Sequence, residues 1–479
     1  MRKSGVLLSV SSLPSKYGIG CFDEAAYKFV DDLVEAKQTY WQILPLGITG
    51  YGDSPYQSFS TFAGNPYFIS LDEFVKCGYL KEEDLPEADI NSDYVDYSYL
   101  YENRYALLKK AYENSHITDN EDFKAYCKDN AWWLEDYALF MAIKASYDNQ
   151  GWENWPLELR LRNDASLTEK RNELSDDINY HKFLQYYVWK QWYALKDYAN
   201  SKGVEIIGDI PIYVAYDSSD VWGQPELFQL DPEVKPTAVA GVPPDGFSAD
   251  GQLWGNPLYD WKKHKETGYA WWIQRIAYCK KAYDVVRIDH FRGFDEYFSI
   301  PYGDTTARNG HWEKGPGYDL FKTVEESLGK INVIAEDLGY LTDTVKQMVA
   351  DCGYPGMKVF EFAFDSRDSS GTSNYLPHNY TENSVVYTGT HDNETLLGYF
   401  NERNDGELGY AYDYLDTRDK CRMVDMVFRA AYSSIAVLTI FSVQDILKLD
   451  NSARMNFPSS LGNNWKWRMK KNQLNWEHL

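Results

Sequence analysis

An α/β barrel is the fold that this sequence predicts, and three observations lead to it. Eight short apolar runs, rich in Val and Ile, are spread along the 479 residues, and helical stretches separate most of them. Such runs are typical of buried parallel strands, and strand–helix alternation is typical of a parallel sheet. Acidic residues end or directly follow three of the later runs, at Asp289, Glu336 and Asp392. We therefore predict one (β/α)8 (TIM) barrel over residues 1–479, with inserted subdomains above the C-terminal mouth of the barrel.

The predicted strands follow one another at intervals that leave room for a helix in most cases. The stretch 25–36 places its apolar residues on one face, as a helix packed on a sheet requires. The stretches 318–328 and 341–352 flank the fifth strand, and Thr342 and Asp343 are candidate N-terminal caps of the second stretch. The eight predicted strands are residues 6–10, 40–44, 204–210, 284–291, 332–338, 357–363, 384–391 and 436–443.

Two segments are too long for a minimal barrel, and we expect both to be insertions. Residues 47–200 contain a loop rich in Gly, Ser and Tyr, followed by a polar helical region rich in Tyr and Trp. Residues 214–280 are rich in Pro, Gly and Trp, and we expect them to form a substrate-binding loop subdomain. Each segment follows a predicted strand, so each should lie above the C-terminal mouth, where the loops of such barrels carry function.

The composition excludes several classes of function. The formal net charge of -24 opposes binding to nucleic acid and to anionic membranes, whereas a neutral sugar meets no such repulsion. No run of about 18 apolar residues is present, so we expect no membrane span. The six cysteines have no paired spacing, which argues against a zinc or iron–sulfur site and is typical of the reducing cytoplasm. The 16 Trp and 40 Tyr have two interpretations, as core packing or as flat faces that suit pyranose rings.

The three acidic residues suit work on a glycosidic bond. Strand alternation puts Arg287 and Asp289 on one side of a strand, where the arginine favours the ionised carboxylate that a nucleophile needs; the alternative is a structural ion pair. Apolar residues precede Glu336, and desolvation raises a carboxyl pKa as a general acid requires. The neighbouring Asp337 should point the other way and is the rival candidate. Asp392 suits hydrogen bonds to sugar hydroxyls.

A metal site is the other interpretation of His391 and Asp392. No second histidine lies at ligand spacing, so we expect no metal ion there.

The loops at 50–60, 241–247 and 251–257 combine aromatic residues with amides and acids. That combination suits sugar binding, but loops rich in Gly and Pro also occur without any function.

Eight short sequence blocks are distributed, in order, along nearly the whole chain. They are Ser9-Val-Ser-Ser-Leu-Pro-Ser with Tyr17-Gly-Ile-Gly, Gly50-Tyr-Gly-Asp-Ser-Pro-Tyr-Gln-Ser-Phe-Ser, Gly208-Asp-Ile-Pro-Ile-Tyr-Val, Gly241-Val-Pro-Pro-Asp, Arg287-Ile-Asp-His-Phe-Arg-Gly, Ala335-Glu-Asp-Leu-Gly, Gly389-Thr-His-Asp-Asn, and Gln444-Asp with Asn451-Ser-Ala-Arg-Met-Asn. Together these blocks resemble glycoside hydrolase family 77, the 4-α-glucanotransferases also called amylomaltase or disproportionating enzyme. Eight blocks in order are far more specific than any one of them.

The resemblance implies a catalytic barrel without an added cofactor that moves segments of α-1,4-glucans, such as maltooligosaccharides, starch or glycogen, to another glucan or to glucose. It implies that Asp289 is the nucleophile, Glu336 the acid/base and Asp392 the transition-state stabiliser of a retaining double displacement. The alternative is an amylase-like retaining hydrolase with the same carboxylates. Gly246 stands where some relatives carry an aromatic residue, and Phe247 is the partial substitute. The residues expected to bind the glucan are Ser54, Tyr56, Asp209, Asp245, Phe247, Trp254, Asn256, Arg287, His290, His391 and Asn456.

Overall fold

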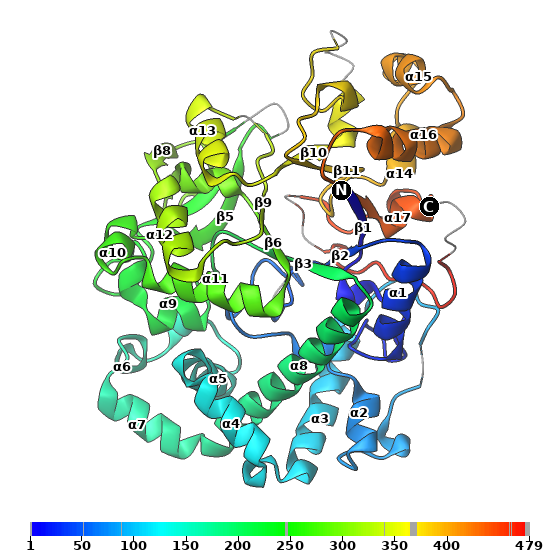
Figure 1. Ribbon diagram of the computed structural model, residues 1–479. Helices are drawn as coiled ribbons and strands as arrows, with labels where there is room; N and C mark the ends of the chain where they lie inside the picture. The colour runs from blue at the N-terminus through cyan, green and yellow to red at the C-terminus, as the bar shows by residue number, and fades with distance from the viewer. Residues whose placement is uncertain are drawn as a thin grey trace.

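The structure is a computed structural model that describes residues 2–50, 52–87, 89–244, 248–339, 341–364, 371–458, 460 and 462–474. Its centre is a closed barrel of eight strands, in the order β1-β12-β11-β10-β9-β6-β3-β2, and all neighbouring strands are parallel (Figure 1). The predicted fold class is therefore confirmed. The barrel strands are β1 (Lys3–Leu7), β2 (Tyr40–Gln42), β3 (Glu205–Ile210), β6 (Val285–Ile288), β9 (Val333–Ala335), β10 (Gly356–Val359), β11 (Ser384–Tyr387) and β12 (Leu438–Ser442).

The helices that cover the barrel begin where the sequence places capping residues. In α1 (Glu24–Glu35) the Asp23 side chain accepts a hydrogen bond from the Ala25 N–H, and the helix buries its apolar face against the barrel. The helix α12 (Tyr318–Leu328) has the predicted bounds. Before α13 (Asp343–Cys352), the Thr342 side chain accepts from the Val345 N–H, so Thr342 and not Asp343 is the cap.

Seven α-helices lie between β2 and β3 in the ranges that the structure describes. The longest, α8, contacts α1 and β3 of the barrel as well as α3, α4, α5 and α7. It is thus both the outer helix of this barrel unit and the element on which α3, α4, α5 and α7 pack (Figure 1). The seven helices are α2 (Leu71–Lys76), α3 (Tyr97–Ser115), α4 (Glu121–Asp129), α5 (Ala131–Ser146), α6 (Leu157–Arg160), α7 (Asp164–Glu173) and α8 (Ser175–Ser201).

A second sheet lies beside the barrel and was not predicted. It has four antiparallel strands in the order β5-β4-β7-β8. Two strands come from the segment after β3 and two from the segment after β6, so two separate barrel loops build one sheet. A small apolar core of Val239, Phe298, Ile300 and Ala307 forms around it. The strands are β4 (Ala238–Val242), β5 (Gln252–Pro257), β7 (Glu296–Pro301) and β8 (His311–Lys314).

The last part of the chain returns to the first strand. The Met469 N–H donates to the Ser12 carbonyl at 2.9 Å, and the Arg468 guanidinium donates to the Ser15 carbonyl at 2.7 Å. Residues after β12 therefore lie next to residues after β1, at the end of the barrel where strands finish. The remaining helices are α9 (Ser219–Gly223), α10 (Trp261–Glu266), α11 (Ala270–Ala282), α14 (Leu396–Glu402), α15 (Gly409–Leu415), α16 (Lys420–Ser433) and α17 (Val443–Ile446).

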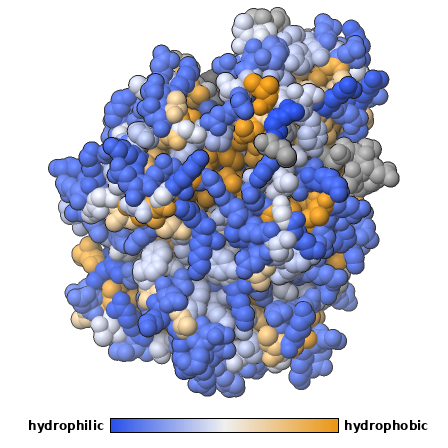
Figure 2. All heavy atoms as spheres, in the orientation of Figure 1, coloured by the Kyte–Doolittle hydropathy of each residue, from blue (hydrophilic) through white to orange (hydrophobic). Residues whose placement is uncertain are grey.

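The surface agrees with the composition, in which 25% of the residues are charged. The face in Figure 2 is mainly hydrophilic, with hydrophobic residues gathered mostly in its upper middle. Within the ranges that the structure describes, no helix has the length and apolar character that crossing a membrane would need.

Candidate active site

The predicted acidic residues meet because their strands are neighbours in the barrel. The β6–β9 register pairs Ile288 with Ala335, so Asp289 and Glu336 are the next residues on two adjacent strands. The main chain fixes this arrangement past the strand ends, because the Glu336 N–H donates to the Ile288 carbonyl at 3.1 Å. The two carboxyl groups therefore start from neighbouring positions at the same mouth of the barrel.

Arg287 joins two carboxylates below this mouth. Its Nη1 lies 2.7 Å from Oδ2 of Asp209, at the end of β3, and its Nη2 lies 2.9 Å from Oδ1 of Asp289. The Tyr56 hydroxyl donates to the same Asp209 carboxylate at 2.8 Å. The Asp209 side chain is fully buried, whereas that of Asp289 remains 30% exposed. The structural ion pair is thus Arg287–Asp209, and Asp289 keeps access to the mouth.

Arg287 acts on Asp289 in the predicted direction, because its charge lowers the pKa of Asp289, but burial has the larger effect. Burial raises the pKa of Asp289, and the negative charges of Asp209 and Asp392 add to the increase. Arg287 and His391 oppose this increase, but burial is the largest influence. The arginine therefore limits an increase in pKa that would otherwise be larger.

Glu336 has the environment of a general acid. Burial and the neighbouring Asp289 charge raise the pKa of Glu336 to about 7, against the opposing effects of Arg287 and two backbone N–H groups. These N–H groups belong to His290 and Leu338 and donate to its two carboxyl oxygens, each at 2.8 Å. Asp337 points away, as predicted, and its Oδ1 accepts from the Met357 N–H of β10 at 2.7 Å.

Asp392 lies in the loop after β11 and is held by the C-terminal segment. The Asn456 side-chain amide donates to Asp392 Oδ1 at 2.6 Å, and His391 Nε2 lies 3.4 Å from Asp392 Oδ2. The Asp392 side chain is 42% exposed, so it also has room to meet a ligand. This carboxylate is close enough to Asp289 for its charge to raise the pKa of Asp289.

Aromatic rings form the walls around the carboxylates. His391 stacks on Tyr56 with ring centroids 5.1 Å apart, and Trp465 lies 5.7 Å from each of these two rings. On the other side, Trp254 of β5 meets His290 edge to face at 4.8 Å. Burial lowers the pKa of His290 to about 3, and among the described residues its buried Nε2 has no hydrogen-bond partner. A neutral His290 is therefore free to bond a ligand.

Two predicted binding residues shape loops. The Ser54 hydroxyl accepts from the Tyr56 N–H at 3.3 Å and so stabilises the turn that carries Tyr56. The Asn256 amide donates to the Val214 carbonyl at 2.8 Å and accepts from the Gln57 amide at 3.0 Å, which joins β5 to two other loops. Two further candidates, Asp245 and Phe247, lie outside the residues that the structure describes.

Sequence reasoning missed Trp465, Arg454 and Gln57 as residues of this region. Trp465 belongs to the basic, aromatic end of the chain, which reads as a segment packed on the barrel. Arg454 lies inside the block Asn451–Asn456, but no local pattern separates it from its neighbours. All three act through contacts between segments far apart in the chain, for which a single sequence carries no signal.

The geometry suits a nucleophile and a proton donor that act on one bond. The Asp289 carboxyl contacts the Arg287 guanidinium, and the adjacent Glu336 carboxyl has a pKa near neutrality. Different environments of this kind let two paired carboxyls perform different tasks. Across the part of the chain that the structure describes, no group of three or more His, Cys, Asp or Glu side chains is arranged to hold a metal ion.

Comparison with known proteins gives consistent matches over the whole chain. A family model described as 4-alpha-glucanotransferase matches residues 8–474. The chain is 51% identical to a 4-alpha-glucanotransferase of Streptococcus pneumoniae, covering 99% of this chain and 94% of the relative, and 48% identical to one of Clostridium butyricum, covering 97% and 96%. The solved structure of amylomaltase from Streptococcus agalactiae in complex with acarbose superposes with a TM-score of 0.95 at 44% identity, covering 99% of this chain and 96% of that one.

Proposed function

The chain belongs to the 4-alpha-glucanotransferase family, and from that premise we propose how its residues act. The reaction moves a segment of an α-1,4-glucan from a donor to glucose or to another glucan, with retention of configuration. The observation that carries this proposal is the placement of Asp289 and Glu336 at the ends of two adjacent parallel strands. Retaining chemistry requires carboxyls about 5–5.5 Å apart, and neighbouring strands lie about 4.8 Å apart.

In the first step Glu336 protonates the glycosidic oxygen while an oxygen of Asp289 attacks the anomeric carbon. The bond to the leaving glucan breaks, and an ester between Asp289 and the glucosyl unit forms. In the second step the ionised Glu336 removes the proton of an incoming 4-hydroxyl group, whose oxygen displaces Asp289. The proton that Glu336 lost is thus recovered, and each step inverts the anomeric centre once.

The other predicted residues serve binding. We propose that Asp392 accepts hydrogen bonds from sugar hydroxyls, and that His290 and His391 bond the unit at the cleavage point. Arg287 stabilises the ionised Asp289 until it attacks. The unpartnered Nε2 of the neutral His290 and the exposed fraction of Asp392 support these assignments.

Transfer exceeds hydrolysis when an acceptor sugar reaches the covalent intermediate more readily than water does. We propose that the insertions at 47–200 and 214–280 provide this selectivity, because Tyr56 from the first packs against His391 and Trp254 from the second packs against His290. All six cysteines have free thiols, which supports a location in the cytoplasm.

Incubation with pure maltotriose tests the proposal. We expect glucose together with a ladder of longer glucans, while the total number of reducing ends stays nearly constant. Maltose and glucose alone, with a steady increase in reducing ends, would assign the protein to hydrolysis instead. Addition of labelled glucose tests the acceptor, since the label should then appear at the reducing end of the products.

A further inference from the structure

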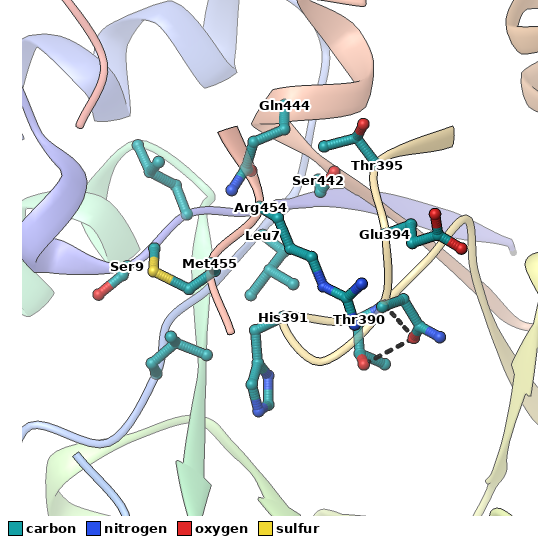
Figure 3. A pocket seen from close by; sticks show the side chains of 13 residues that line it. Leu7, Ser9, Thr390, His391, Glu394, Thr395, Ser442, Gln444, Arg454 and Met455 are labelled. Atoms are coloured by element: carbon teal, nitrogen blue, oxygen red, sulfur yellow. Dashed lines mark hydrogen bonds between the residues drawn. The ribbon is translucent and has the colours of Figure 1, made fainter. Parts of the chain in front are cut away.

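Arg454 connects the two segments that hold Asp392, although it lies behind the carboxylate. Its Nη2 donates to the main-chain carbonyl of Asp392 at 2.8 Å. Its Nε donates to the main-chain carbonyl of Asn456, also at 2.8 Å. Figure 3 shows Arg454 extending from the C-terminal segment toward the loop that carries Thr390 and His391. One guanidinium group therefore holds the loop after β11 and the segment after β12 together.

The loop after β11 and the segment after β12 also meet through the Asn456 side chain, which contacts the Asp392 carboxylate. The Asn456 amide donates to Asp392 Oδ1 at 2.6 Å, and the Asn456 N–H donates to the His391 carbonyl at 3.1 Å. Arg454 closes a ring of contacts from Asp392 to Asn456 and back to Asp392. The orientation of the Asp392 carboxylate thus depends on where the guanidinium fixes the two main chains.

The surroundings of Arg454 favour a fixed, charged guanidinium. Its positive charge helps lower the pKa of Glu394, and the Phe457 ring lies 4.5 Å from its Cζ atom. Glu361, on whose charge Arg454 also acts, is buried, and burial together with Glu394 raises the pKa of Glu361 to about 8. A neutral Glu361 at pH 7 does not draw the guanidinium away from the two carbonyls.

We propose that Arg454 is a positioning residue for glucan transfer, which acts by fixing the Asp392 carboxylate through the main chains of Asp392 and Asn456. The inference rests on the proposed function, because it assumes that Asp392 works on the sugar. The fork of the guanidinium is required, since two carbonyls on different segments must be held by donors of fixed relative direction. A lysine ammonium keeps the charge but lacks that fork.

Arg403 offers a matched control in the same group of charges. It pairs with Glu394 at 2.9 Å and donates to the Tyr399 carbonyl at 2.9 Å, so it also joins a carboxylate and a main chain. Through Glu394 it reaches the same loop, but among the described residues it donates to neither the Asp392 carbonyl nor the Asn456 carbonyl. Loss of either arginine should disturb packing, but only loss of Arg454 should disturb the orientation of Asp392.

The experiment compares Arg454→Lys, Arg454→Ala and Arg403→Ala in maltotriose transfer, with Tm measured for each. We expect kcat of both Arg454 variants to fall by about 10-fold to 100-fold, as a displacement near 1 Å produces, with little change in KM. Guanidinium at sub-denaturing concentration should restore part of the kcat of Arg454→Ala, because the groove lined by Arg454 is open, and should not raise that of Arg403→Ala. A kcat that Arg454→Lys leaves unchanged, or an equal loss of kcat in Arg403→Ala at equal Tm, would overturn the proposal.

A double-mutant cycle with Asp392→Asn separates this inference from the proposed function. With an activated glycosyl fluoride as donor, the loss caused by Arg454→Ala should shrink to less than about threefold once Asp392 has lost its carboxylate. An undiminished loss in the Asp392→Asn background would show that Arg454 acts elsewhere. Failure of the unmodified protein to transfer maltotriose would instead contradict the proposed function.

Discussion

The barrel and the antiparallel sheet beside it contribute different things to the same site. Barrel strands β3, β6 and β9 place Asp209, Arg287, Asp289 and Glu336 in a register fixed by continuous parallel pairing. The sheet supplies Trp254 and Asn256 from β5, whose pairing with β4 shifts between Val239 and Gly241. The groups proposed to make and break bonds thus lie on the regular element, and the groups proposed to shape the glucan-binding walls lie on the irregular one.

This difference has a physical reason. Bond-making carboxyls must be held within a fraction of an ångström, and closed strands with main-chain hydrogen bonds on both sides provide that. Recognition of a long, flexible glucan tolerates more variation, so loops that fold into a small sheet are sufficient. Substitutions in the barrel should therefore change kcat, and substitutions in the sheet should change mainly KM.

The largest expected effect comes from the barrel side. Asp289→Asn removes the proposed nucleophile, and we expect kcat for maltotriose transfer to fall by about 10⁴-fold or more. Asp284→Asn is the control: Asp284 directly precedes β6 and accepts from the Ile206 N–H at 2.8 Å, at the end of the strand away from the mouth. Loss of the Asp284 carboxylate should lower Tm but leave kcat unchanged. Substantial turnover in Asp289→Asn would assign the nucleophile to another residue.

The pH dependence follows from the unequal environments of the two carboxyls. Glu336 must be protonated to act as the acid, and its pKa is raised to about 7, so kcat/KM should fall about tenfold per pH unit above that value. On the acid side Asp289 must be ionised, and its pKa is raised above the ordinary 3.8, so activity should also decline as pH falls. A profile that stays flat to about two units above neutrality would contradict the assignment of Glu336.

A smaller effect is expected from the sheet. Trp254→Ala removes an aromatic face beside His290, and we expect KM for maltotriose to rise about tenfold while kcat changes less. Tyr302→Ala is the matched control, because Tyr302 follows β7 of the same sheet and is 52% exposed. It should change neither constant. A selective loss of kcat in Trp254→Ala would mean that the sheet takes part in the chemistry and would remove the distinction between the two regions.

The smallest expected effect concerns stability. The raised pKa of Glu336 means that the folded protein holds a proton that the unfolded chain releases between pH about 4.5 and about 7. The folded state is therefore disfavoured progressively as pH rises through this range, and the cost is constant above it. The difference in Tm between Glu336→Gln and the unmodified protein should shift in favour of the variant across the same range. A difference independent of pH would show that the pKa of Glu336 is not raised.

The sequence predicted the barrel well because each barrel strand is an apolar run between helical stretches. The first strand shows where this signal fails. β1 contains Lys3, Ser4 and Gly5, which break the apolar run, but pairing of Lys3 with Leu438 of β12 makes them part of the barrel. Gly5 is needed there because a side-chain carbon would collide with Tyr40 of β2. Such restrictions on the residue type come from neighbouring strands, and a local sequence pattern does not contain them.

The antiparallel sheet and the C-terminal wall of the site escaped prediction for a related reason. β8 is the polar sequence His-Trp-Glu-Lys, which carries no strand periodicity and is formed by pairing with β7. Trp465 reaches Tyr56 from the opposite end of the chain. The three carboxylates were found because each ends or follows an apolar strand, and a charge placed there costs desolvation free energy that a function explains.

Direct detection of the covalent intermediate tests the central claim, that Asp289 and Glu336 divide a retaining transfer between them. Glu336→Gln should still react with α-maltotriosyl fluoride, because fluoride leaves without an acid, but the second step should stall without its base. Mass spectrometry of the quenched, digested variant should find one maltotriosyl group on the peptide that contains Asp289. A maltotriosyl group on another residue, or none while the fluoride is consumed, would contradict the account.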